Sequence, residues 1–123
     1  MTYVLIAIGG ATGALARYVL DTLISERAAG LFPWGTLVVN VSGSFVLGVL
    51  YALTVERGVL PPEARAALLI GFLGAYTTFS TFMLESFRLV EEGAYAAALV
   101  NIAGSVMLGF AAVVAGIAIG RFV

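Results

Sequence analysis

Hydroxyl and aromatic residues cluster in the middle of an otherwise apolar stretch, in the run Gly74-Ala75-Tyr76-Thr77-Thr78-Phe79-Ser80-Thr81-Phe82. Gly71 and Gly74, followed by β-branched and hydroxyl residues, favour a break in a helix near residues 74–78. At membrane depth the freed backbone groups must be satisfied by protein, water or an ion. Freed carbonyls suit a hard cation such as Na⁺, and helix N-termini suit anions. A continuous helix with hydroxyls bonded to carbonyls one turn back is the alternative.

Beyond this point Phe79 and Phe82 lie three residues apart and share a helix face. A second, polar stripe of the same helix has one residue per turn and consists of Thr77, Thr81 and Glu85. Phenylalanine pairs at helical spacing usually pack in a core. Their alternative use is electrostatic, because the rim of a phenyl ring is partly positive and attracts a small anion without trapping it.

The two asparagines of the chain, Asn40 and Asn101, both lie inside apolar spans, and each is followed one turn later by a serine, Ser44 and Ser105. An amide in hydrocarbon is costly unless it has a partner. The asparagines therefore either form hydrogen bonds between helices or present NH₂ groups to a hydrated anion path.

Charged residues within or near the spans are further candidates. Glu85 is intramembrane or nearly so, which makes it a functional candidate, and an ion pair with Arg88 is the simpler explanation. Arg17 stands toward the end of the first span, where its side chain has the length to reach the interface.

Composition excludes several kinds of chemistry. The chain has no Cys, His or Lys, which removes thiol nucleophiles, the commonest general base and Schiff-base lysines. Its net charge is −1 with no basic run, so we expect no nucleic-acid partner. No phosphate-binding glycine loop is present, so we expect no nucleotide. The sequence predicts a protein that is not an enzyme.

The elements that must position these residues are membrane helices. The chain is 62% apolar and only 11% charged, and charge spacing delimits four spans at about residues 3–24, 34–55, 63–90 and 93–120. Short connections leave no room for a soluble domain. We therefore expect one all-α domain, residues 1–123, with four transmembrane helices.

Arginines predict an unusual insertion. Arg57, Arg65 and Arg121 belong to one side, and Arg27, Arg88 and Arg17 to the other, so the positive-inside rule selects no orientation. Either another feature orients the chain, or copies insert both ways and pair antiparallel. Pairs of small residues four apart predict close helix packing within or between chains, at Gly9/Gly13, Ser44/Gly48, Ser105/Gly109 and Gly116/Gly120.

The chain resembles the small bacterial fluoride channels of the CrcB/Fluc family along nearly its whole length. The matching segments are residues 9–18 (GGATGALARY), 34–40 (WGTLVVN), 43–45 (GSF) and, most specifically, 74–82 (GAYTTFSTF). The resemblance implies an antiparallel dual-topology homodimer in the cell membrane, with two pores through which cytoplasmic fluoride leaves passively.

The same resemblance implies roles for individual residues. Backbone carbonyls of Gly74 and Thr77 correspond to those that hold a central structural Na⁺ at the dimer axis. Pore residues correspond to Phe79, Phe82, Asn40, Ser80, Thr81, Glu85 and Ser105, with Arg17 near a vestibule. Met83 and Gly109 stand where some relatives have hydroxyls, which shortens the expected polar track.

A small proton-coupled multidrug transporter, also with four short spans and dual topology, is the alternative function. That mechanism needs a membrane-embedded carboxylate in the first helix. Here the first-helix carboxylate, Asp21, lies near the end of the span, and the embedded one is Glu85 in the third.

Overall fold

Four long helical segments make up the chain, and the computed structural model describes all 123 residues. They are α1 (Thr2–Ser25), α2 (Trp34–Tyr51) continued by the π-helical η1 (Ala52–Glu56), a composite third segment, and α6 (Tyr95–Phe122). The third segment consists of α3 (Pro62–Ala66), π-helical η2 (Ala67–Leu73), α4 (Gly74–Tyr76) and α5 (Ser80–Glu91). The four segments of 24, 23, 30 and 28 residues are long and apolar enough to cross a membrane, so the prediction of four spans is confirmed.

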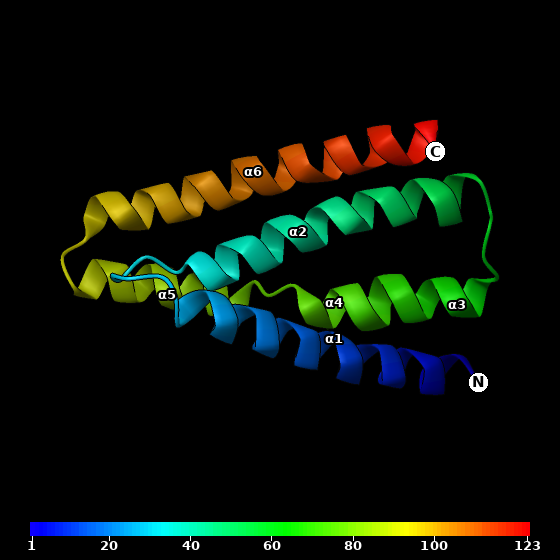
Figure 1. Ribbon diagram of the computed structural model, residues 1–123, viewed down its shortest axis with the longest axis horizontal. Helices are drawn as coiled ribbons and strands as arrows, with labels where there is room; N and C mark the ends of the chain where they lie inside the picture. The colour runs from blue at the N-terminus through cyan, green and yellow to red at the C-terminus, as the bar shows by residue number, and fades with distance from the viewer.

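The segments run up and down side by side (Figure 1). Both termini and the connection from η1 to α3 lie at one end of the bundle, and the other two connections lie at the opposite end. Each connection contains a glycine with positive φ, namely Gly30 at 96°, Gly58 at 65° and Gly93 at 74°. Residues that have a Cβ rarely adopt a positive φ, so glycine permits these tight reversals. Pro62 begins α3 at a position where its missing amide hydrogen costs nothing.

Glycines allow α1 to lie against the third segment. A Cβ at Gly9 would overlap the carbonyl oxygen of Ala67, and one at Gly13 would overlap that of Phe72. Both carbonyls belong to η2, whose π-helical turns are wider than α-helical ones. The close approach replaces side-chain contacts with backbone contacts, the packing mode that small residues permit in membranes.

The same device joins α2 to α6. A Cβ at Gly48 would overlap the carbonyl oxygen of Val113, and one at Gly116 would overlap that of Phe45. A Cβ at Gly120 would also lie too close to the carbonyl oxygen of Val49, at 2.8 Å. The predicted motifs at Gly9/Gly13, Ser44/Gly48 and Gly116/Gly120 therefore pack within the chain. The exception is Ser105/Gly109, because nothing but the Ser44 hydroxyl, 3.7 Å away, would approach a Cβ at Gly109.

Little of the chain is buried. Only 17 of 123 residues are, and the apolar ones among them are Val39, Ala52, Leu73, Phe82, Leu89 and Ala98. Large apolar side chains are exposed along all four segments, as expected where lipid replaces water as the solvent.

Substitution of Gly13 by Ala tests the backbone contact between α1 and η2. We expect Gly13→Ala to destabilise the protein by roughly 1–3 kcal/mol, because the added methyl meets a backbone carbonyl that cannot retreat. Gly104→Ala is the matched control, since nothing lies within 4 Å of a Cβ at that position. Thermal unfolding in detergent measures the difference. Equal midpoints for the two variants would contradict the packing.

Candidate ion pathway at the interrupted helix

Three residues interrupt the third span. The α4 helix ends at Tyr76, Thr77 has the extended backbone angles φ −85° and ψ 155°, and α5 begins at Ser80. Figure 1 shows this uncoiled segment between α4 and α5. The interruption lies within the run of hydroxyl and aromatic residues, and its unpaired backbone groups need partners.

Asn40 of α2 supplies two of those partners. Its Oδ1 accepts a hydrogen bond from the amide of Thr78 at 2.8 Å, and its Nδ2 donates to the carbonyl of Thr78 at 3.0 Å. In a continuous α-helix that amide would instead bond to the carbonyl of Gly74. Asn40 therefore replaces a helical bond of the third span and leaves the carbonyl of Gly74 without it.

The carbonyl of Thr77 is also without a helical partner. The amide of Thr81, which would reach it in a continuous helix, lies 3.4 Å from the hydroxyl oxygen of Thr78. No donor of the chain bonds to the carbonyl of Thr77. Gly74 is exposed and Thr77 is half-buried, so both carbonyls are available to an oxygen-seeking cation.

Arg17 also reaches the interruption. Its Nε donates to the carbonyl of Ala75 at 3.1 Å. The guanidinium thus stands beside the last carbonyls of α4, where a cation stabilises a helix C-terminus. The expectation that Arg17 reaches toward the interface is wrong, because its side chain turns back to the middle of the third span.

A groove of about 340 Å³ runs beside the interruption and brings several predicted residues together. It is lined from three segments, and the predicted residues among its lining are Asn40, Gly74, Thr77, Phe79, Phe82 and Ser105. Phe79 is 74% exposed, whereas Phe82 is 6% exposed. Their centroids are 6.1 Å apart with 71° between ring planes, so the edge of one ring meets the face of the other.

Four predicted residues lie elsewhere. Ser80, Thr81 and Glu85 are on α5 but do not line the groove, and Arg17 reaches the interruption from α1. Glu85 lies further along α5, where one carboxylate oxygen accepts a hydrogen bond from Thr36 at 2.9 Å. Its other oxygen, Oε2, is buried and has no hydrogen-bond partner.

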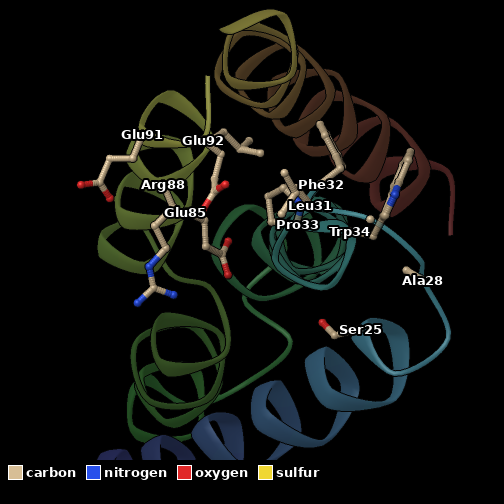
Figure 2. A pocket seen from close by; sticks show the side chains of 12 residues that line it. Ser25, Ala28, Leu31, Phe32, Pro33, Trp34, Glu85, Arg88, Glu91 and Glu92 are labelled. Atoms are coloured by element: carbon tan, nitrogen blue, oxygen red, sulfur yellow. The ribbon is translucent and has the colours of Figure 1, made fainter. Parts of the chain in front are cut away.

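The ion pair between Glu85 and Arg88 is absent from the structure. The single salt bridge of the chain joins Glu56 to Arg121 at 2.7 Å. Glu85 and Arg88 instead line a second cavity of about 480 Å³ beside the first and third connections. Figure 2 shows this cavity, with the Arg88 guanidinium turned away from the Glu85 carboxylate.

Residue types and spacing did not indicate the hydrogen bonds of three further residues, Thr36, Thr78 and Ser86. Thr36 stands one turn before Asn40, and Ser86 directly follows Glu85, so each was adjacent to a residue already singled out. The role of Thr78 depends on the backbone conformation at the interruption, which residue types do not specify. Asn101 forms the interhelical hydrogen bond that was one of its two interpretations, with Ser86 at 2.9 Å.

Replacing Asn40 by the similarly shaped Leu tests its hold on the interruption. We expect Asn40→Leu to leave the Thr78 amide and carbonyl unpaired, at a cost of roughly 1–3 kcal/mol for each group. Amide hydrogen exchange at residues 77–80 should accelerate. Ser44→Ala is the control, because that hydroxyl bonds only to the Asn40 carbonyl, at 2.7 Å. Unchanged exchange in Asn40→Leu would contradict the assignment.

Comparison with known proteins identifies the family of the chain. Residues 4–117 match the family described as "CrcB-like protein, Camphor Resistance (CrcB)". The chain is 51% identical over 121 residues to the "Fluoride-specific ion channel FluC" of Solibacter usitatus, covering 98% of this chain and 99% of that one. A protein of the same name from Solidesulfovibrio magneticus is 50% identical over 118 residues, covering 96% and 94% of the two chains. With its four membrane-spanning segments, this chain is a multi-pass membrane protein that belongs to the CrcB family.

Proposed function

We propose that this chain forms a fluoride-selective channel through which cytoplasmic fluoride leaves the cell passively. The observation that carries the proposal is the groove, which places two phenylalanine rings, an asparagine amide and a serine hydroxyl beside an interrupted helix. These are the groups that attract a small anion without a full positive charge. The relatives described above bear the name of a fluoride-specific ion channel.

The groove suits an anion that must bind and leave. Phe79 and Phe82 both line the groove, and the rim of a phenyl ring carries partial positive charge that an anion can approach. The Asn40 NH₂ group donates one hydrogen bond to the carbonyl of Thr78, and its second hydrogen is free to donate to an anion. No arginine lines the groove, so no full charge holds the anion there.

The proposal includes a second copy of the chain, because a single copy leaves the groove open to the surroundings. Phe79 is 74% exposed beside it, and Gly74 is exposed at the interruption. An antiparallel partner would bury both and complete two symmetry-related pores. The arginines fit insertion in both directions, since Arg57, Arg65 and Arg121 lie at one end and Arg27 and Arg88 at the other.

A structural Na⁺ is part of the same proposal. The carbonyls of Gly74 and Thr77 lack their helical partners, and neutral carbonyl oxygens are the ligands that a hard monovalent cation accepts at a broken helix. Those carbonyls would hold the ion, and it would supply a positive charge at the interruption. The chain's own contribution is made by Asn40 and Thr78, which keep those carbonyls free.

Passive conduction needs no energy source within the chain. The inside-negative membrane potential favours anion exit by roughly 2.3 kcal/mol per charge per 100 mV. The multidrug-transporter alternative requires a carboxylate in the first helix that exchanges protons at membrane depth. Asp21 instead lies in the last turns of α1 and accepts a hydrogen bond from Ser25 at 3.2 Å. We therefore favour the channel.

Halide efflux from liposomes tests the proposed function. We expect the purified chain to release fluoride far faster than chloride, without dependence on a pH gradient. Phe82→Ile should lower fluoride efflux at least about tenfold, because an aliphatic side chain has no positive rim. Phe87→Ile is the matched control, since Phe87 is on α5 but 57% exposed and away from the groove. Proton-coupled drug uptake, or chloride release as fast as fluoride release, would count against the channel. Equal fluoride efflux from the two variants would remove Phe82 from the mechanism.

Added lysines test insertion in both directions. Val59→Lys with Val123→Lys adds two charges at one end of the bundle, at positions 65% and 79% exposed. We expect this pair to impose one orientation and abolish efflux, because antiparallel partners would no longer form. Val59→Lys with Leu31→Lys, one at each end, should leave efflux intact. A single cysteine at Ser25, labelled by an impermeant maleimide, reports orientation. Full activity from a uniformly oriented population would refute dual topology.

A further inference from the structure

A series of three side-chain hydrogen bonds connects the groove to the backbone of α5. The hydroxyl of Ser105 donates to Asn101 Oδ1 at 3.4 Å, Asn101 Nδ2 donates to the hydroxyl of Ser86 at 2.9 Å, and that hydroxyl donates to the carbonyl of Phe82 at 2.8 Å. Asn101 is 1% exposed and Ser86 is 3% exposed. Both residues are therefore fixed in the interface between α5 and α6.

The direction of these bonds sets the orientation of the Asn101 amide. Ser86 uses its one hydroxyl proton on the carbonyl of Phe82, so it offers Asn101 only an acceptor. Asn101 must then turn its NH₂ toward Ser86 and its Oδ1 toward Ser105. The groove-lining hydroxyl of Ser105 consequently faces a fixed acceptor.

Two serines on the groove use their protons differently. Ser44 donates to the backbone carbonyl of Asn40, four residues back, at 2.7 Å. Ser105 has the equivalent carbonyl of Asn101 four residues back but bonds to the Asn101 side chain at 3.4 Å. Hydroxyl hydrogen bonds are normally 2.5–3.0 Å long, so the Ser105 bond is weak. Of these two hydroxyls, that of Ser105 therefore reorients more easily to donate a hydrogen bond to an anion.

We propose that Asn101 is a positioning residue of the anion path and that it acts through Ser105. Its Oδ1 gives the Ser105 hydroxyl an acceptor other than the backbone carbonyl, through a hydrogen bond that is long and therefore easily exchanged. An anion in the groove accepts the hydrogen bond of the Ser105 hydroxyl in place of Asn101, with no transfer of the proton, and the hydroxyl donates to Asn101 again when the anion moves on. This role rests on the proposed channel function, and it satisfies the need of a pore for binding that is easily reversed.

Asn101→Leu tests the proposal because it keeps the volume of the side chain and removes the acceptor. Ser105 should then bond to the backbone as Ser44 does, and fluoride efflux should fall about five- to tenfold, the equivalent of one lost hydrogen bond. The ratio of fluoride to chloride efflux should fall with it, which a merely structural role would not cause. The double variant with Ser105→Ala should be no slower than Ser105→Ala alone. Thr54→Val, at a 2% exposed position outside the groove, is the control.

The outcomes separate the two claims. Efflux and selectivity of Asn101→Leu equal to those of the unmodified chain, or losses that multiply in the double variant, would overturn the role of Asn101 alone. Absence of fluoride efflux from the unmodified chain would overturn the channel and this role with it. Where Asn101→Leu fails to form a folded protein, Ser86→Ala is the second variant, because it removes the partner that orients the Asn101 amide. Wild-type selectivity in Ser86→Ala would then overturn the proposal.

Discussion

Backbone amides and carbonyls at membrane depth must find partners within the protein, and the interruption at residues 77–79 makes this requirement acute. Neighbouring segments meet most of it. Asn40 of α2 pairs with both backbone groups of Thr78, and Arg17 of α1 takes the carbonyl of Ala75. The carbonyl of Thr77 still has no hydrogen-bond donor, and the carbonyl of Gly74 has lost the donor that a continuous helix would supply. The proposed ion site consists of the groups that these partners leave free.

Helix packing places Arg17 and Asn40 within hydrogen-bonding distance of the interruption. Gly9, Gly13 and Arg17 are spaced four residues apart, so they share one face of α1. Backbone contact of the two glycines with η2 brings that face against the third segment, and Arg17 then lies one turn further along, beside Ala75. The glycine contacts between α2 and α6 likewise bring Asn40 and Ser105 into the lining of one groove. Small residues far from any ion thus decide the geometry of the path.

Much of the architecture followed from residue type. Charge spacing and hydropathy were sufficient for the four spans, and glycine spacing for three of the four close contacts. Periodicity did not predict the π-helical turns of η1 and η2, because they depend on tertiary contacts. Position in the sequence also gave the wrong surroundings for Arg17 and Glu85. Their hydrogen-bond partners, Ala75 for Arg17 and Thr36 for Glu85, come from other segments. The direction of a hydrogen-bond series such as that through Asn101 requires coordinates.

We propose that a second, inverted copy of the chain completes the ion site at the open carbonyls of the interruption. A high-resolution density map of the purified protein in lipid with Na⁺ is the decisive experiment. We expect two antiparallel chains whose interruptions face each other, with a density on the two-fold axis within bonding distance of the Gly74 and Thr77 carbonyls. A parallel pair, a monomer, or an axis filled only by side chains would contradict it.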